Sequence, residues 1–119
     1  MAGVKQGASL QSVIALRGKP TSESQPEDFV ELVHHYEGLE VGYFQSRVVH
    51  VRATATGWCT AHGLCPSNST RRMQALYGAP RVHPFRPHVA TYWQSGPDCW
   101  YVFELSQGVV AEVGIACQP

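Results

Sequence analysis

The stretch GASLQSVIALRGKP at residues 7–20 recurs sixty residues later as SNSTRRMQALYGAP at residues 67–80. Self-similarity at a fixed offset indicates a duplicated unit, and a unit of about 60 residues would be marginally stable alone. We therefore expect a first repeat at residues 1–62 and a second repeat at residues 63–119 that share one compact domain. The identical positions are Ser9/Ser69, Ala15/Ala75, Leu16/Leu76, Gly18/Gly78 and Pro20/Pro80.

Each of these stretches carries the start and stop signals of a short α-helix. A serine precedes the helical residues and can accept hydrogen bonds from the unpaired amides of the first turn. A glycine just past the helix permits a left-handed C-terminal cap, and the proline two residues later prevents continuation. The sequence therefore predicts helices at residues 10–17 and 70–77.

Three segments rich in β-branched and aromatic residues follow each predicted helix, and turn residues separate them. Hairpin connections of this kind produce antiparallel strands. The sequence therefore predicts an α+β fold of two αβββ repeats, with the short helices packed on one face of an antiparallel sheet. Either one continuous sheet or two sheets with a shared core is expected. The predicted strands are residues 29–36, 39–44 and 45–51, and then 89–94, 99–105 and 106–113.

The bulk composition narrows the class of protein. The 119 residues are 44% apolar and 10% aromatic, which suffices for a core and argues against disorder. Nine acidic and nine basic residues give zero net charge, so we expect no nucleic-acid partner. Apolar runs fall short of the ~18 residues of a membrane span. The first residues lack the apolar region of a signal peptide, so the protein is either cytosolic or has lost its leader.

Four cysteines, an even number, permit two disulfides. Cys59 and Cys65 bracket the stretch CTAHGLC, where a disulfide would staple the junction between the repeats. A three-residue turn between the last two strands would leave Cys117 diagonal to Cys99, and a bulge or longer turn would bring the pair together. Zinc held by Cys59, His62 and Cys65 is an alternative, as are four idle thiols.

The helical motif also links the chain to known proteins. The pattern S-x-x-x-V-x-x-L-x-G-x-P, followed by three strands and then repeated, resembles the repeat of the β-lactamase inhibitor protein and of the small outer-membrane assembly lipoproteins of the SmpA/OmlA type. The resemblance covers most of the chain and implies a non-enzymatic module of the bacterial envelope that binds other proteins through sheet surfaces and loops. The motif residues are Ser9, Val13, Leu16, Gly18 and Pro20, then Ser69, Met73, Leu76, Gly78 and Pro80.

Aromatic residues gather toward the second repeat and suggest a binding surface. Successive residues of a strand face opposite sides of the sheet, so part of this set must leave the core. Exposed aromatic rings suit a protein partner or a flat ligand, whereas buried rings only fill the core. The candidates for an outer binding surface are Tyr43, Trp58, Trp93 and Trp100.

Two proline-containing loops at matching positions carry opposite charge. They are TSESQPED at residues 21–28 and RVHPFRPH at residues 81–88. Both could simply be solvated, or the basic loop could meet an acidic partner, including the acidic loop of a second copy. The acidic loop contains Glu23, Glu27 and Asp28, and the basic loop contains Arg81, Phe85 and Arg86.

The sequence contains no recognisable catalytic motif, such as His-Glu-x-x-His on a helix or a serine in a nucleophile elbow. We therefore expect a non-enzymatic protein-protein binding module, inhibitor-like or envelope-associated, without cofactor or metal. A small-molecule binder with an aromatic pocket between helices and sheet is the first alternative, and a zinc- or thiol-dependent enzyme is the second. The expected location is periplasmic or secreted, with the cytoplasm left open.

Overall fold

The computed structural model describes residues 3–26, 29–83, 85–93 and 98–118, and this part of the chain forms two helices and eight strands. Among these residues, no helix combines the length and the apolar character that a membrane crossing requires. The first half contains α1 (Leu10–Arg17), β1 (Ser22–Ser24), β2 (Leu32–Tyr36), β3 (Leu39–Phe44) and β4 (Arg47–Ala53). The second half contains α2 (Thr70–Tyr77), β5 (Arg81–His83), β6 (Arg86–Trp93), β7 (Cys99–Ser106) and β8 (Val109–Cys117).

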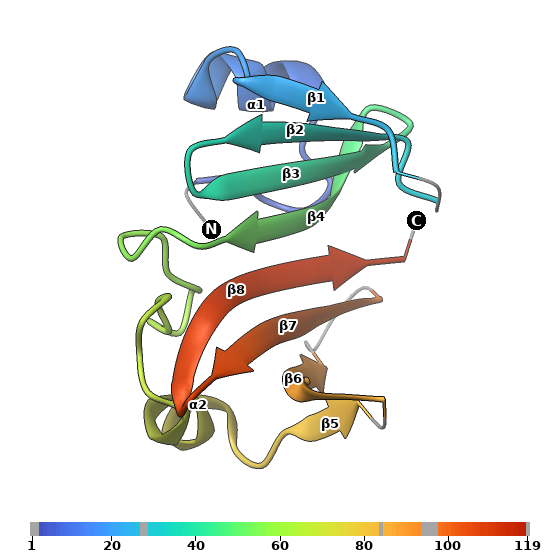
Figure 1. The fold of residues 1–119 in the computed structure, drawn as a ribbon. Coiled ribbons are helices and arrows are strands. Elements are labelled where there is room, and N and C mark those ends of the chain that lie inside the picture. Colours follow the sequence, from blue (N-terminus) through green and yellow to red (C-terminus); the bar gives the residue numbers. More distant parts are fainter. Residues whose placement is uncertain (1–2, 27–28, 84, 94–97, 119) are drawn as a thin grey trace.

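The described strands all belong to one antiparallel sheet in the order β1-β2-β3-β4-β8-β7-β6-β5. Figure 1 shows them following one another from β1 at the top to β5 at the bottom. The halves join where β4 pairs with β8, from His50 opposite Ala116 to Ala53 opposite Val113. We call this pairing the seam. The predicted α+β class with antiparallel strands is confirmed, and the sheet is continuous.

Both helices begin and end where the sequence predicts. The hydroxyl of Ser9 accepts a hydrogen bond from the amide of the third helical residue of α1 at 3.1 Å, and Ser69 does the same in α2 at 3.1 Å. Gly18 and Gly78 follow the helices with φ of 82° and 86°, a conformation that residues with a Cβ rarely adopt.

Each half contains four strands rather than the predicted three, because a short strand follows each helix. These strands, β1 and β5, form the two edges of the sheet. Their sequences, Ser-Glu-Ser and Arg-Val-His, are too short to show a period-two apolar pattern, so neither strand was predicted. The neighbouring strands also start elsewhere: β2 begins at Leu32 instead of residue 29, and β6 begins at Arg86 instead of residue 89.

Corresponding hydrogen bonds tie each helix to its own half of the sheet. The amide of Gly7 donates to the carbonyl of Val48 at 2.8 Å, and that of Ser67 donates to the carbonyl of Val110 at 2.8 Å. The segment before each helix is thereby fixed against the last strand of its half. At the other helix ends, the hydroxyl of Tyr36 donates to Gly18 O at 3.0 Å and that of Tyr92 to Gly78 O at 2.9 Å.

One hydrophobic cluster takes side chains from both helices and from both halves of the sheet. Val13 of α1 and Met73 of α2 belong to it and are only 2% and 0% exposed. Full burial of a methionine side chain stabilises the fold by about 1.5–3 kcal/mol. The cluster also contains Leu39, Phe103 and Val113, so the helices pack on the sheet face to which these residues point. We call this the inner face and the opposite one the outer face.

Candidate functional site

A row of charged side chains crosses the outer face from the first half to the second. Each member on β2, β3, β4, β7 and β8 alternates along its strand with an inner-face residue, as Glu40 does between Leu39 and Val41. Arg86 of β6 joins the row through its ion pair with Glu104. The row is His35 (β2), Glu40 (β3), Arg52 (β4), Glu112 (β8), Glu104 (β7) and Arg86 (β6), hereafter the charged row.

Ion pairs connect the charged row within each half and across the seam. Arg52 lies 2.8 Å from a carboxylate oxygen of Glu40 and 3.6 Å from one of Glu112, so it bridges β3, β4 and β8. On the other side, Arg86 lies 2.8 Å from Glu104. Half-exposed pairs of this kind contribute about 0–1 kcal/mol each, so they pattern the charge of the surface more than they stabilise the fold.

Glu112 occupies an unusual place in the charged row, because it lies directly opposite Glu104 in the β7–β8 pairing. Burial raises the pKa of Glu112, Arg52 lowers it, and the neighbouring carboxylate of Glu104 raises it, with a net increase. Burial acts to lower the pKa of Arg52, but the carboxylates of Glu112 and Glu40 outweigh this effect and raise the pKa above its ordinary value. The guanidinium therefore stays charged, and the carboxyl group of Glu112 takes up a proton at a higher pH than a free glutamate does.

An aromatic pair lies on the same outer face, near the end of β6 and the start of β7. Trp93 and Trp100 are paired across the two strands, with ring centroids 5.8 Å apart and planes at 67°. Trp93 is 68% exposed, and Trp100 is half-buried. Arg81 and Thr91 line a small depression of about 180 Å³ beside the pair. Of the four aromatic candidates from the sequence, these two share a surface.

The other two aromatic candidates do not belong to this surface, and the prediction for Tyr43 is wrong. Tyr43 is 1% exposed, lies with its ring centroid 5.0 Å from that of His34, and has its pKa raised by burial. It follows Leu39 and Val41 at period two along β3, so it points to the inner face. Trp58 lies in the loop after β4, half-buried against the core, with the Arg17 guanidinium 5.7 Å from its ring centroid.

The basic loop is only partly available for an acidic partner. Phe85 is 88% exposed in the turn between β5 and β6, and Arg81 is exposed on the edge strand. Arg86, however, is already paired with a carboxylate of the charged row. In the acidic loop, Glu23 lies 3.3 Å from Nε2 of His34, while Glu27 and Asp28 fall outside the described residues.

Both predicted disulfides are present, joining Cys59 to Cys65 and Cys99 to Cys117. The second pair becomes directly opposed because the β7–β8 turn is tighter than predicted and a bulge at Glu104/Leu105 shifts the register. Since all four thiols are oxidised, none serves here as a zinc ligand or nucleophile. Among the described residues, no group of three or more potential metal ligands is found.

His62, the predicted third zinc ligand, instead packs in the stapled loop. Its ring centroid lies 5.1 Å from that of Tyr77 and 6.3 Å from that of Tyr101. Tyr77 in turn donates a hydrogen bond to the hydroxyl of Thr60 at 2.7 Å, and burial raises its pKa to about 12. His62 itself stays exposed, whereas Thr60 and Leu64 of the same loop are buried, so the loop covers one side of the core.

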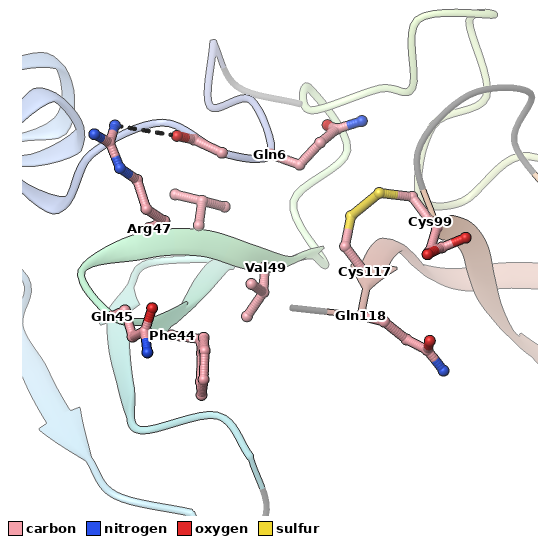
Figure 2. Close-up of a pocket in the computed structure, with 11 residues that line it drawn as sticks. Gln6, Phe44, Gln45, Arg47, Val49, Cys99, Cys117 and Gln118 are labelled. Carbon is pink, nitrogen blue, oxygen red and sulfur yellow. Dashed lines mark hydrogen bonds between the residues drawn. A yellow bond between two sulfur atoms is a disulfide. The ribbon is translucent and has the colours of Figure 1, made fainter.

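A cavity of about 500 Å³ opens beside the seam, at the end of β8. Figure 2 shows Arg47 on one side of it, the Cys99–Cys117 disulfide on the other, and Val49 between them. Between the helices and the sheet, core side chains pack together, and Leu10, Leu32 and Tyr43 line a smaller hollow of about 140 Å³. Neither the large cavity nor the charged row was predicted from the sequence, since both depend on which strands meet at the seam.

Among solved structures, two resemble this fold at low sequence identity. One is the crystal structure of an extracellular protein containing a SCP domain from Bacillus anthracis, with a TM-score of 0.63 and 11% identity over 95% of this chain. This chain spans 44% of that protein. The other is a DUF4309 family protein (YjgB) from Bacillus subtilis, with a TM-score of 0.54 and 14% identity over 93% of this chain and 79% of that one.

At such identities the likeness concerns the fold alone. No protein-family model matches the chain, and the curated proteins contain no match to its sequence. The candidate site therefore has to be judged by its own geometry.

Proposed function

We propose that the protein is a non-enzymatic module that binds another protein through the outer face of its sheet. The observation that carries this proposal is the Trp93–Trp100 pair, whose first ring is 68% exposed beside a row of ion pairs. Tryptophan and arginine are the residues that most often dominate the binding energy of protein interfaces. A large exposed indole is costly in water, and a protein partner would bury it.

The proposal includes a location outside the cytoplasm and a duplicated architecture. Two disulfides are compatible with an oxidising, periplasmic or secreted environment, as is the likeness to an extracellular protein. The matching helix caps and matching tyrosine hydrogen bonds support residues 1–62 and 63–119 as copies of one unit. A second copy of the chain remains one candidate partner, through the basic loop.

A photo-crosslinking amino acid in place of Trp93 tests the outer face directly in the cells that produce the protein. We expect adducts of discrete mass from this position, and we expect Trp100→Ala to abolish them. The same amino acid in place of Arg71, which is exposed on α2, is the control and should give none. Equal crosslinking from both positions, or none from position 93, would contradict the proposal.

Binding measurements with the partner identified by crosslinking then give the contribution of Trp93 to the affinity. Trp93→Ala should weaken binding at least about 30-fold, the effect of losing about 2 kcal/mol at an interface hot spot. Leu16→Ala, which removes another exposed apolar side chain from α1, should leave binding unchanged. For the self-association form, sedimentation should show a dimer at low salt that dissociates at high salt; a monomer under both conditions excludes it.

A further inference from the structure

The cavity of about 500 Å³ exists because β4 and β8 separate beyond the seam. On the β4 side, the carbonyl of Val48 is occupied by the amide of Gly7 at 2.8 Å. On the β8 side, the Cys99–Cys117 disulfide holds the strand end against β7. The two strand ends are thus fixed to different neighbours, and the opening between them follows from the bonds of the fold itself.

The cavity has an apolar floor and a polar rim, the usual composition of a site for a small organic ligand. Val48, Val49 and the disulfide are buried and form the floor, and Phe44 is half-buried at its side. Its volume lies within the range of about 300–1,000 Å³ that is typical for ligand sites. The polar side chains that line it are Gln6, Gln45, Arg47, Asp98 and Gln118.

The two charged groups of the rim have opposite signs and come from different ends of the opening. Arg47 begins β4, where its guanidinium also donates to the carbonyl of Gly7 at 3.3 Å. Asp98 precedes the disulfide, and its carbonyl accepts from the amide of Gln118 at 2.9 Å. Figure 2 places Arg47 and the disulfide on opposite sides, with the apolar Val49 between them. The lining is therefore positive at one side and negative at the other.

A molecule that complements this lining carries a carboxylate at one end, an ammonium group at the other and an apolar body between them. The carboxamide side chains of Gln45 and Gln118, each with two donors and an acceptor oxygen, add partners for amide groups of the same molecule. Hydrogen bonds to charged groups are the stronger ones, so the two ends would dominate the binding energy. A short peptide with apolar side chains has this combination of groups, whereas a free α-amino acid carries both charges on one carbon.

We propose that the cavity binds a short zwitterionic peptide, with its carboxylate at Arg47 and its ammonium group at Asp98. This site shares no lining residue with the charged row, but Gln118 lines both the cavity and the depression beside the Trp93–Trp100 pair. Arg47 and Asp98 line the cavity and not that depression, so substitutions at these two residues distinguish peptide binding from protein binding at the outer face.

Titration of the ¹⁵N-labelled full chain with alanine, Ala-Ala and Ala-Ala-Ala tests the site and separates free amino acids from peptides. We expect saturable amide shifts at the residues around the cavity for Ala-Ala or Ala-Ala-Ala, and much weaker binding of alanine, which carries both charges on one carbon. N-acetylation or C-amidation of the peptide that binds should each weaken binding about tenfold or more, because each removes a charge-assisted contact. Saturable shifts confined to other parts of the chain, an absence of shifts, or equal binding of the blocked ligands would overturn the proposal.

Substitutions at the two rim charges assign the ends of the ligand. Asp98→Asn should weaken binding of the unmodified ligand about tenfold and leave binding of the N-acetylated ligand unchanged. Arg47→Gln should likewise weaken binding of the unmodified ligand and leave binding of the C-amidated ligand unchanged. Glu37→Gln and Arg71→Gln change exposed charges outside the cavity and should have no effect. An unchanged amide spectrum outside the cavity shows that each variant is folded. If N-acetylation of the ligand weakens its binding to the Asp98→Asn variant as much as its binding to the wild type, the assignment is wrong.

Discussion

Removal of the Cys99–Cys117 disulfide should cost more stability than removal of Cys59–Cys65, and the difference follows from the chain that each bond closes. The bonds span 18 and 6 residues of sequence. In the chain-entropy model, the cross-link that closes the longer loop lowers the unfolded-state entropy by the equivalent of about 3 kcal/mol, and the one that closes the shorter loop by about 2 kcal/mol. The double substitutions Cys99→Ala/Cys117→Ala and Cys59→Ala/Cys65→Ala should therefore differ by about 1 kcal/mol.

Urea unfolding at 25 °C, followed by tryptophan fluorescence without reductant, measures both losses in free energy. A reductant gives an internal control, because it should lower the stability of each variant to that of the reduced wild type. A larger loss for the short loop, or equal losses for both, would refute the reasoning that loop length determines the contribution. In that case packing at the sulfur atoms, and not chain entropy, would have to explain the result.

Three further predictions concern single side chains. Ser9→Ala and Ser69→Ala should each lower the free energy of unfolding by about 1 kcal/mol, since each removes one N-cap hydrogen bond, and unequal losses would show that the two helix starts are not equivalent. For Glu112, a folded pKa above its unfolded value means that its contribution to the free energy of unfolding falls as pH rises through the interval between the two values. Glu112→Gln should therefore show a different dependence of unfolding free energy on pH between pH 4 and 8, without this fall. The same pH dependence in variant and wild type would contradict the prediction. Gly38→Ala should lower the thermal unfolding temperature more than Gly108→Ala, although both glycines have positive φ. A Cβ at Gly38 would lie 2.6 Å from a methyl group of the loop after β4, whereas a Cβ at Gly108 would meet open space. Equal losses in the two variants would refute the steric argument.

The helices and the Cys59–Cys65 disulfide were predictable because their signals are local. A serine cap and a terminal glycine fix the ends of an eight-residue helix without reference to the rest of the chain. The Cys59–Cys65 bond likewise follows from a short loop. The Cys99–Cys117 bond was only conditionally predictable, because the length of the turn and a one-residue bulge together decide whether the two cysteines lie opposite each other.

The candidate surfaces were less predictable because they depend on contacts distant in sequence. Glu40 and Arg52 share one hairpin, but the bridge from Arg52 to Glu112 exists only when β4 lies beside β8. No local pattern specifies that neighbour. The error at Tyr43 has a simpler origin, since the period-two pattern from Leu39 already pointed this residue toward the core.

The two ends of the sheet restrict how this protein can meet others. β1 and β5 are each three residues long, so an incoming strand finds few backbone amides and carbonyls with which to pair. Sheet extension, the common route to both peptide capture and aggregation, is therefore disfavoured at either margin. Recognition of a partner therefore has to rely on side chains. The sheet of eight described strands is protected from edge-to-edge aggregation, while its outer face remains accessible to a partner.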